Sequence, residues 1–227
     1  MNKTADIQNL SDTPSGDDTE FFGWVNYFLV KQGHEFFSVI DKSYLNDNFN
    51  LKGLLSVFQC YDLALDMIRD VETEEDFSEW QADMIENNAA ILYGLIHARW
   101  IITAAGMRAM LIKYRHRIFG SCPRVLCDRQ SLLPVGLSDK KGAESVKLYC
   151  VNCREVYKCM TSNIDGAFFG TTFPHLFFLI FPELRPKKAK QLYKPRIFGF
   201  MLHSTSHEQS LEAVRAKKAR KQEGKKI

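Results

Sequence analysis

Hydrophobic residues recur every three or four positions through the middle of the chain, as they do on one face of a helix. This spacing predicts amphipathic helices at 54–69, at about 80–100 and at 102–115. The acidic segment Asp70–Glu79 separates the first two. We therefore expect this part of the chain to form a helical domain.

The pattern changes at Gly120. Beyond it, Gly and Pro interrupt the chain at short intervals, and short apolar runs lie between them. Two of these runs, Val146–Tyr149 and Phe177–Phe181, predict β-strands. The second half of the chain is therefore expected to contain a small module rich in turns.

The composition is that of an ordinary globular protein, with 45% hydrophobic and 25% charged residues among 227. The first twelve residues lack the apolar run of a signal peptide. The longest apolar run, around Leu176–Phe181, is far shorter than the roughly 18–20 residues that span a bilayer. These features predict a cytoplasmic and nuclear protein that does not enter a membrane. Disulfides are disfavoured there, so the six cysteines are expected to be metal ligands or free thiols.

The net charge of +3 conceals a strong asymmetry along the chain. From Arg185 onward there are 13 Lys and Arg against three acids, whereas the rest carries 17 basic and 24 acidic residues. Such a chain can bind different partners at its two ends, although a solvated acidic loop and a disordered basic tail would carry the same charges. The acidic loop holds six acids and no base: Asp70, Glu72, Glu74, Glu75, Asp76 and Glu79.

Four of the cysteines form two close pairs. The members of one pair are separated by four residues, those of the other by two, and 22 residues lie between the pairs. This spacing is typical of a tetrahedral four-thiolate zinc site in a ribbon, and four thiolates leave no position open for catalysis. The alternative is four buried thiols that pair by chance. Cys159 could compete as a ligand, but the chain would have to turn sharply to allow this, so Cys159 is not included in the site. Cys60 is expected to be a free thiol. The predicted ligands of one structural Zn²⁺ are Cys122, Cys127, Cys150 and Cys153.

Motifs for catalysis are missing from the sequence. It contains no G-x-G-x-x-G loop, no phosphate loop ending in Gly-Lys-Ser/Thr and none of the kinase catalytic signatures. It also lacks a G-x-S-x-G elbow and an H-E-x-x-H pair. We therefore predict that the chain is not an enzyme and that any catalysis comes from a partner.

Several longer stretches carry a family resemblance. SCPRVLCDRQSLLPVGLSD and VKLYCVNC surround the cysteine pairs, and WVNYF, GHEFFSVI, YLNDNFNLKGL, ALDMI, LYGLIHAR, DGAFFGTTFPH and PELRPK occur elsewhere. Together they resemble the beta regulatory subunits of casein kinase II, from about Trp24 to His203. The resemblance implies a non-catalytic chain that binds and modulates catalytic alpha subunits and their choice of protein substrates.

The resemblance also implies how such a chain assembles. Zinc modules of this family pair to form a beta dimer, and the dimer binds two catalytic subunits. Leu126, Val135, Leu137 and Val146 exceed what one small ribbon can bury, which fits a dimer face, although some of them must line the ribbon's own core. The family's docking hairpin matches the carboxy-terminal run, in which Phe198 and Phe200 would share one face of a strand. The expected docking residues are Arg196, Phe198, Gly199, Phe200 and His203.

These inferences define an α+β fold: an amino-terminal all-helical domain, a small four-cysteine zinc-ribbon β module, and a carboxy-terminal hairpin and tail. The predicted divisions begin with a disordered segment at 1–20 and a helical domain at 21–117. A zinc-ribbon dimerisation module at 118–184 and a basic segment with the docking hairpin at 185–227 follow.

The sequence departs from the family at two regulatory features. The family's acidic loop is associated with polyamines, which clustered carboxylates attract, but here the loop is shorter and interrupted by apolar residues. The family's amino-terminal serine cluster, which the kinase phosphorylates, is missing from the start of the chain. Ser15 precedes Asp17 and Asp18 and is the proposed substitute phosphorylation site.

Two other interpretations remain open at the level of sequence. A nucleic-acid-binding zinc ribbon would explain the ribbon spacing and the basic run KKARKQEGKK, although basic tails attract phosphate without specificity. A paralogue that keeps the fold but has lost its kinase partner would carry the same motifs.

Overall fold

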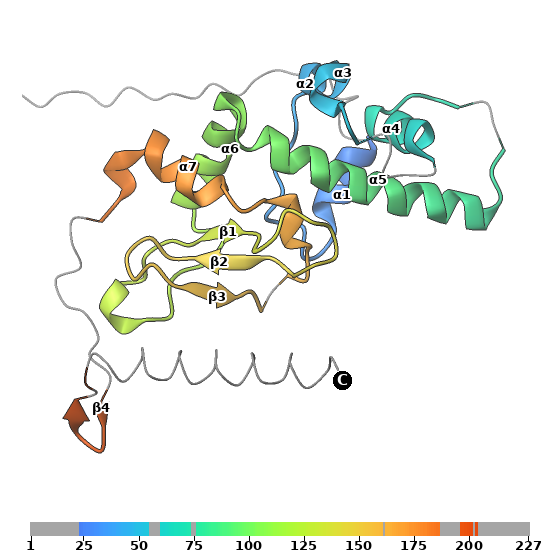
Figure 1. Cartoon of the computed structure of the whole chain (residues 1–227). Helices are drawn as coiled ribbons and strands as arrows, with labels where there is room; N and C mark the ends of the chain where they lie inside the picture. The colour runs from blue at the N-terminus through green and yellow to red at the C-terminus, as the bar shows by residue number, and fades with distance from the viewer. Residues whose placement is uncertain are drawn as a thin grey trace, which may run out of the picture.

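The computed structural model describes residues 23–54, 60–73, 76–160, 162–186, 196–201 and 203. Figure 1 shows a layer of helices above a small antiparallel sheet. Its helices are α1 (Trp24–Val30), α2 (Lys42–Asn46), α3 (Asn48–Leu51), α4 (Tyr61–Arg69), α5 (Glu79–Trp100), α6 (Ala104–Arg115) and α7 (Phe173–Ile180). Short 3₁₀ turns are η3 (Val125–Cys127), η4 (Gly166–Phe168) and η5 (Pro182–Leu184). The strands are β1 (Leu133–Val135), β2 (Lys147–Tyr149), β3 (Val156–Lys158), β4 (Arg196–Ile197) and β5 (Phe200–Met201).

Helix α5 is the long central element of the helical layer (Figure 1). It begins at a capping box, in which the Ser78 hydroxyl accepts from the backbone N–H of Gln81 and the Gln81 side chain accepts from the backbone N–H of Ser78. Helix α4 packs along it. Gly94 lets the ring of Phe168 in η4 lie directly against the α5 backbone, where a Cβ atom would collide with it. This glycine thus brings the helix close to the loop that follows the sheet.

The predicted helices at about 80–100 and 102–115 are confirmed as α5 and α6. The helix predicted from residue 54 is wrong at its start, because Leu54 lies outside any helix and α4 begins at Tyr61. Residues 55–59 lie outside the described part of the chain.

Strands β1, β2 and β3 form an antiparallel sheet in sequence order. Leu133 pairs with Tyr149 across the first ladder, and Leu148 pairs with Tyr157 across the second. The predicted strand at 146–149 is confirmed as β2 over Lys147–Tyr149.

The strand predicted at 177–181 is wrong, because these residues belong to helix α7 up to Ile180. Pro174 lies in the first turn, where its missing N–H costs nothing. Phe173, Phe177 and Phe178 are buried, which is the spacing of one helical face. An apolar run this short does not distinguish a buried strand from a buried helix.

One hydrophobic cluster joins the helical layer and the sheet. It contains Leu92 and Ile96 of α5 together with Leu133 of β1 and Phe177 of α7. The proposed division at residue 118 stays a prediction, since the core itself is continuous across that position.

His97 lies in this core with no exposed surface. One ring nitrogen, Nε2, accepts from the backbone N–H of Ser38 at 3.1 Å, and Nδ1 contacts the carbonyl oxygen of Phe168 at 2.9 Å. These two bonds require a neutral ring that donates through Nδ1. His97 is thus a hydrogen-bonded core histidine, whereas His175 on α7 is exposed.

The stability of the protein is expected to fall in mild acid because of His97. Burial lowers the pKa of His97 to about 4, so the unfolded chain takes up a proton near pH 6.5 and the folded chain does so only near pH 4. Folding is therefore weakened as the pH falls through this window, by about 2 kcal/mol at pH 5. Urea unfolding of the wild type and of His97→Gln at pH 7.5 and pH 5 measures this change. The difference in unfolding free energy between the two proteins should change by that amount from pH 7.5 to pH 5. An identical pH dependence in both proteins would exclude His97 as the source of the loss of stability in acid.

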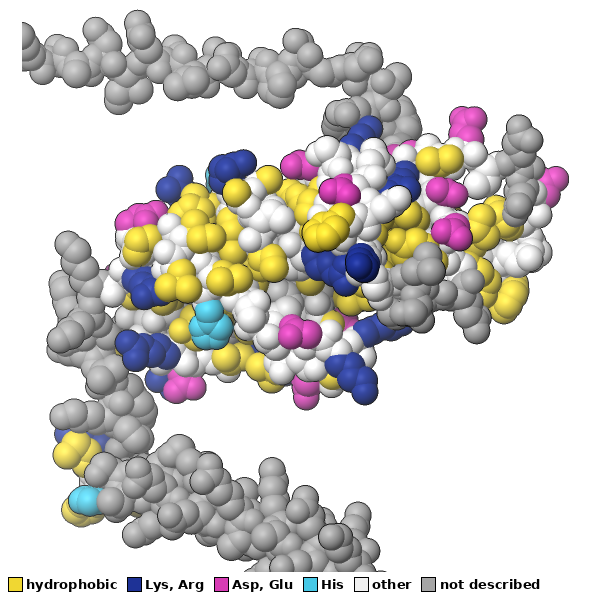
Figure 2. Space-filling model, turned by 45° about the horizontal axis from the view of Figure 1, so that its top comes forward, with side chains coloured by type: hydrophobic (Ala, Val, Ile, Leu, Met, Phe, Trp, Pro, Cys, Tyr) yellow, Lys and Arg dark blue, Asp and Glu magenta, His cyan; other side chains and the backbone are white. Residues whose placement is uncertain are grey.

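In the part of the chain that the structure describes, no single helix is long and apolar enough to cross a membrane. Helices α5 and α6 meet the length and composition limits only as a pair bent by 98°. Hydrophobic side chains on the face shown in Figure 2 lie between charged ones.

Candidate metal centre and docking hairpin

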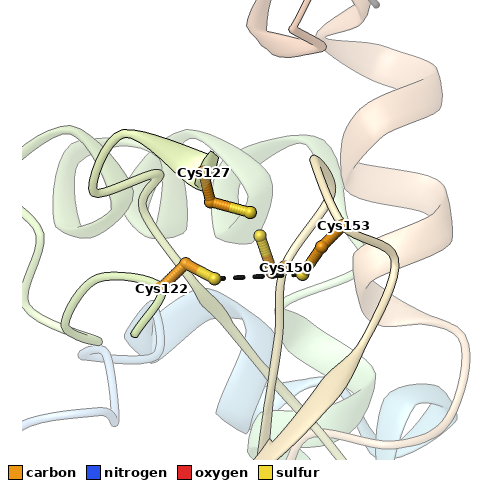
Figure 3. Close-up of side chains that lie close together, drawn as sticks. All are labelled: Cys122, Cys127, Cys150 and Cys153. Atoms are coloured by element: carbon orange, nitrogen blue, oxygen red, sulfur yellow. Dashed lines mark hydrogen bonds between the residues drawn. The ribbon is translucent and has the colours of Figure 1, made fainter. Parts of the chain in front are cut away.

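The first cysteine pair is held by a tight loop before β1. Backbone hydrogen bonds close it: the N–H of Cys122 donates to Gln130 at 2.8 Å, and that of Gln130 donates to Cys127 at 3.0 Å. Asp128 and Arg129 follow η3 with φ of 49° and 51°, a left-handed conformation that turns the chain sharply. The two sulfurs are thereby directed to the same side of the loop, as Figure 3 shows.

The second pair lies in the turn between β2 and β3. The N–H of Arg154 donates to the carbonyl oxygen of Cys150 at 2.8 Å, and the N–H of Cys150 donates to Glu155 at 3.0 Å. Arg154 has φ of 59°, so this turn also uses a left-handed residue. Cys150 is fully buried and Cys153 is half-buried.

The sheet brings the four predicted ligands together (Figure 3). All four sulfur atoms lie within 4.8 Å of one another, and those of Cys122 and Cys153 are 3.8 Å apart. With Zn–S bonds of about 2.3 Å, a tetrahedral site has sulfurs about 3.8 Å apart. The cluster could therefore hold one metal ion, and its soft, four-sulfur donor set suits zinc. Cys159 is buried outside the cluster, as expected from the sequence.

The surroundings of the cluster act on its thiols in different directions. Burial raises the pKa of Cys127 to about 11 and also raises the pKa of Cys150. Burial acts to raise the pKa of Cys153 as well, but hydrogen bonds from Tyr157 and the backbone at Glu155 outweigh it and lower this pKa. Burial thus keeps Cys127 and Cys150 protonated without a metal, so metal binding should release protons.

Tyr157 on β3 is a neighbour of the cluster that the sequence did not single out. Its hydroxyl oxygen lies 3.1 Å from the sulfur of Cys153 and 3.6 Å from that of Cys122. A hydroxyl there can donate to a metal-bound thiolate and hold its charge. Only the position of Tyr157, four residues after Cys153, could have suggested this role.

Two of the residues expected at a dimer face belong to the chain's own core instead. Val146 is fully buried and Val135 nearly so, whereas Leu126 and Leu137 are exposed. The exposed pair, together with Val125 and Val156, contributes apolar surface of this module that remains open.

The carboxy-terminal residues form a two-stranded hairpin, with Arg196 opposite Met201 and Ile197 opposite Phe200. The expectation that Phe198 and Phe200 share one face of a strand is wrong. Phe198 and Gly199 are the two turn residues, with φ of 49° and 85°, and only Phe200 lies in a strand. Two positive φ values are what a tight two-residue hairpin turn requires.

The side chains of the hairpin are presented to solvent. Phe198 is 96% exposed and Phe200 is 79% exposed. The Arg196 guanidinium donates to the carbonyl oxygen of Gly199 at 3.3 Å and so braces the turn. His203 is also exposed.

The acidic loop contains one carboxylate with a structural role. Asp70 ends α4 in a left-handed conformation, and its Oδ1 accepts from the backbone N–H of Trp24 at 2.7 Å. Glu72 and Asp76 are exposed, and Glu79 begins α5. Glu74, Glu75 and the predicted phosphorylation site Ser15 lie outside the described residues, as do the segment 1–20 and most of the basic tail.

The fold and the cluster together define a class of protein: a helical layer joined to a three-stranded sheet that brings four cysteines to one metal site. The family model for the casein kinase II regulatory subunit matches residues 23–201. The chain therefore belongs to the casein kinase II regulatory subunit family, whose members are non-catalytic.

Relatives from distant organisms show the same relationship. Casein kinase II subunit beta of Dictyostelium discoideum is 46% identical over 86% of this chain and 74% of its own length. The subunit beta of Schizosaccharomyces pombe is 47% identical over 88% of this chain and 87% of its own. The subunit beta' of Drosophila melanogaster is 43% identical over 86% and 90%.

Proposed function

We propose that this chain is a zinc-dependent dimer that binds catalytic subunits of casein kinase II and modulates their choice of protein substrates. The observation that carries the proposal is the exposed aromatic hairpin at 196–201, which ends the stretch 23–201 that the regulatory-subunit model matches. The chain supplies no catalytic groups, so its effect on the kinase must come from binding.

Zinc is the proposed metal because the four ligands are all sulfur and lie at tetrahedral spacing. Cys122, Cys127, Cys150 and Cys153 would hold it as a structural ion. The sheet has only three strands of three residues each. A module this small gains much of its folding energy from the metal.

Dimerisation is proposed to occur through the apolar surface of the same module. Val125 is 92% exposed, and Leu126, Leu137 and Val156 are also exposed large apolar side chains. Their contact with a second copy would remove apolar surface from water. The metal would fix the loop that carries Val125 and Leu126, because both residues lie between its ligands Cys122 and Cys127.

Docking of the kinase is proposed to use Phe198 and Phe200 as anchors. A hairpin tip with two exposed aromatic rings can place both in pockets of a partner, and buried aromatic anchors dominate binding energy at interfaces. The turn geometry keeps Phe198 at the very tip, where it would enter such a pocket first. The bond from Arg196 to Gly199 keeps this tip in shape before binding.

The test is capture of the full chain by an immobilised casein kinase II catalytic subunit. We expect Phe198→Ala combined with Phe200→Ala to weaken binding about 1000-fold, because each anchor contributes about 2 kcal/mol. Phe49→Ala is the matched control, since Phe49 on α3 is also 79% exposed and lies far along the chain from the hairpin. Binding by the double variant as tight as that of Phe49→Ala would remove the hairpin from the docking surface.

A further inference from the structure

A cavity of about 390 Å³ lies beside the sheet, outside the metal cluster and away from the docking hairpin. Tyr149 at the end of β2 and Arg154 in the second cysteine turn form one side of it. His175 and Phe178 of α7 form another, and Arg185 lies beyond η5. Its volume is within the range of small-ligand sites.

Among the residues that the structure describes, the charged ones that line this cavity are all of one sign. Of the described residues that line it, Arg154, Arg185 and His175 are basic and none is acidic. Neither arginine forms an ion pair within the part of the chain that the structure describes. The neighbouring Glu155 is instead paired with Arg124 at 3.5 Å. Two guanidinium groups therefore face the cavity without a carboxylate partner there.

The basic groups share the cavity with one phenol, because Tyr149 lines it together with Arg154 and Arg185. The ring of His175 is centred 6.1 Å from that of Tyr149. The phenol hydroxyl can donate a hydrogen bond beside the two guanidinium groups.

The remainder of the lining is apolar, with Val151 and Leu179 at the rim and the buried Phe178 in the wall. A ligand that fits must therefore combine an oxyanion with a group that tolerates apolar contact. A free inorganic anion would leave this apolar wall uncovered, whereas a residue of a peptide would cover it.

We propose that this cavity binds a phosphorylated serine or threonine side chain of a substrate peptide. Arginine forks match phosphate oxygens in a bidentate manner, and arginine clusters are the common means of recognising phosphorylated peptides. The inference deepens the proposed function and rests on it, because a subunit that modulates a serine/threonine kinase meets peptides already phosphorylated at one site. Such a cavity would favour these peptides over unmodified ones.

The test uses the full zinc-loaded chain and a fluorescent acidic peptide with one phosphoserine, followed by fluorescence anisotropy. The same peptide with serine, and with aspartate, in that position distinguishes phosphate from carboxylate. We expect the phosphoserine peptide to bind at least about tenfold tighter than either. Arg154→Gln and Arg185→Gln should each remove about tenfold of this affinity. Equal binding of the three peptides would overturn the proposal.

Arg108→Gln on α6 is the matched control, since it removes one exposed arginine outside the cavity. It should leave the affinity unchanged, and an equal loss in this variant would show a general effect of charge and reject the site. Because Arg154 adjoins Cys153, zinc content is measured in each variant. If Arg154→Gln loses zinc, Arg185→Gln alone decides.

Capture by the catalytic subunit separates the two proposals. The cavity variants should bind the kinase as the wild type does, because the hairpin is intact. If the catalytic subunit does not capture the wild-type chain, the proposed function is rejected. Peptide binding is then still judged by its own measurement. Displacement of the peptide by inorganic phosphate at an equal concentration would reject the peptide as the ligand.

Discussion

Cys150→Ser is expected to abolish metal binding and to unfold the sheet. Cys150 is fully buried at the end of β2, and its sulfur is one of four within 4.8 Å. A serine there leaves three sulfurs and a poor fourth ligand, so the site should lose most of the roughly 10–16 kcal/mol of apparent metal-binding energy that couples to folding in small zinc modules. Zinc per chain should fall from one to nearly none, and the near-ultraviolet circular dichroism of Tyr149 and Tyr157 should diminish.

The same substitution should separate the proposed dimer. The exposed Val125 and Leu126 lie in the loop that the metal holds, so its loss should leave monomers by light scattering. Cys159→Ser is the control: this cysteine is also buried but lies outside the cluster, so zinc content and dimer should persist. A Cys150→Ser protein that stays folded and paired without zinc would contradict both the structural role of the metal and its link to dimerisation.

The features that sequence predicted best depend on residues close together in the chain. Helix α5 begins where Ser78 and Gln81 form a capping box and α6 begins at the cap Thr103, so periodicity and local hydrogen bonds agree. The cysteine cluster could be predicted equally well from the sequence, because a metal with four thiolate ligands requires the two cysteines of each pair to lie a few residues apart. In both cases the physical cause acts over a few residues.

The features that sequence missed depend on contacts between distant segments. The structural role of Asp70 arises from a hydrogen bond to Trp24, 46 residues earlier, and nothing near Asp70 distinguishes it from its acidic neighbours. The basic cavity joins Arg154 to Arg185 across α7. Phe198 was misplaced on a strand for a different reason: its φ is positive, which puts it in the turn, and a phenylalanine rarely adopts that conformation.

Phe177→Ala and Leu179→Ala are expected to differ greatly, and the difference distinguishes the helix from the strand that the sequence suggested. On a strand, residues two apart face the same side and would respond alike. On α7, Phe177 is fully buried while Leu179 is 65% exposed. The two substitutions therefore compare an inward and an outward position on one short element.

Phe177→Ala should lower the free energy of unfolding by about 3–5 kcal/mol, because its removal leaves a cavity in the core. The lost ring packs against Tyr114 of α6 at 5.3 Å between centroids and against Phe181 at 5.1 Å, so α7 would lose its hold on the helical layer. Leu179→Ala should change stability by less than about 0.5 kcal/mol. Chemical denaturation of the zinc-loaded protein measures both. Equal losses at the two positions would mean that they share a buried face, which a helix does not allow.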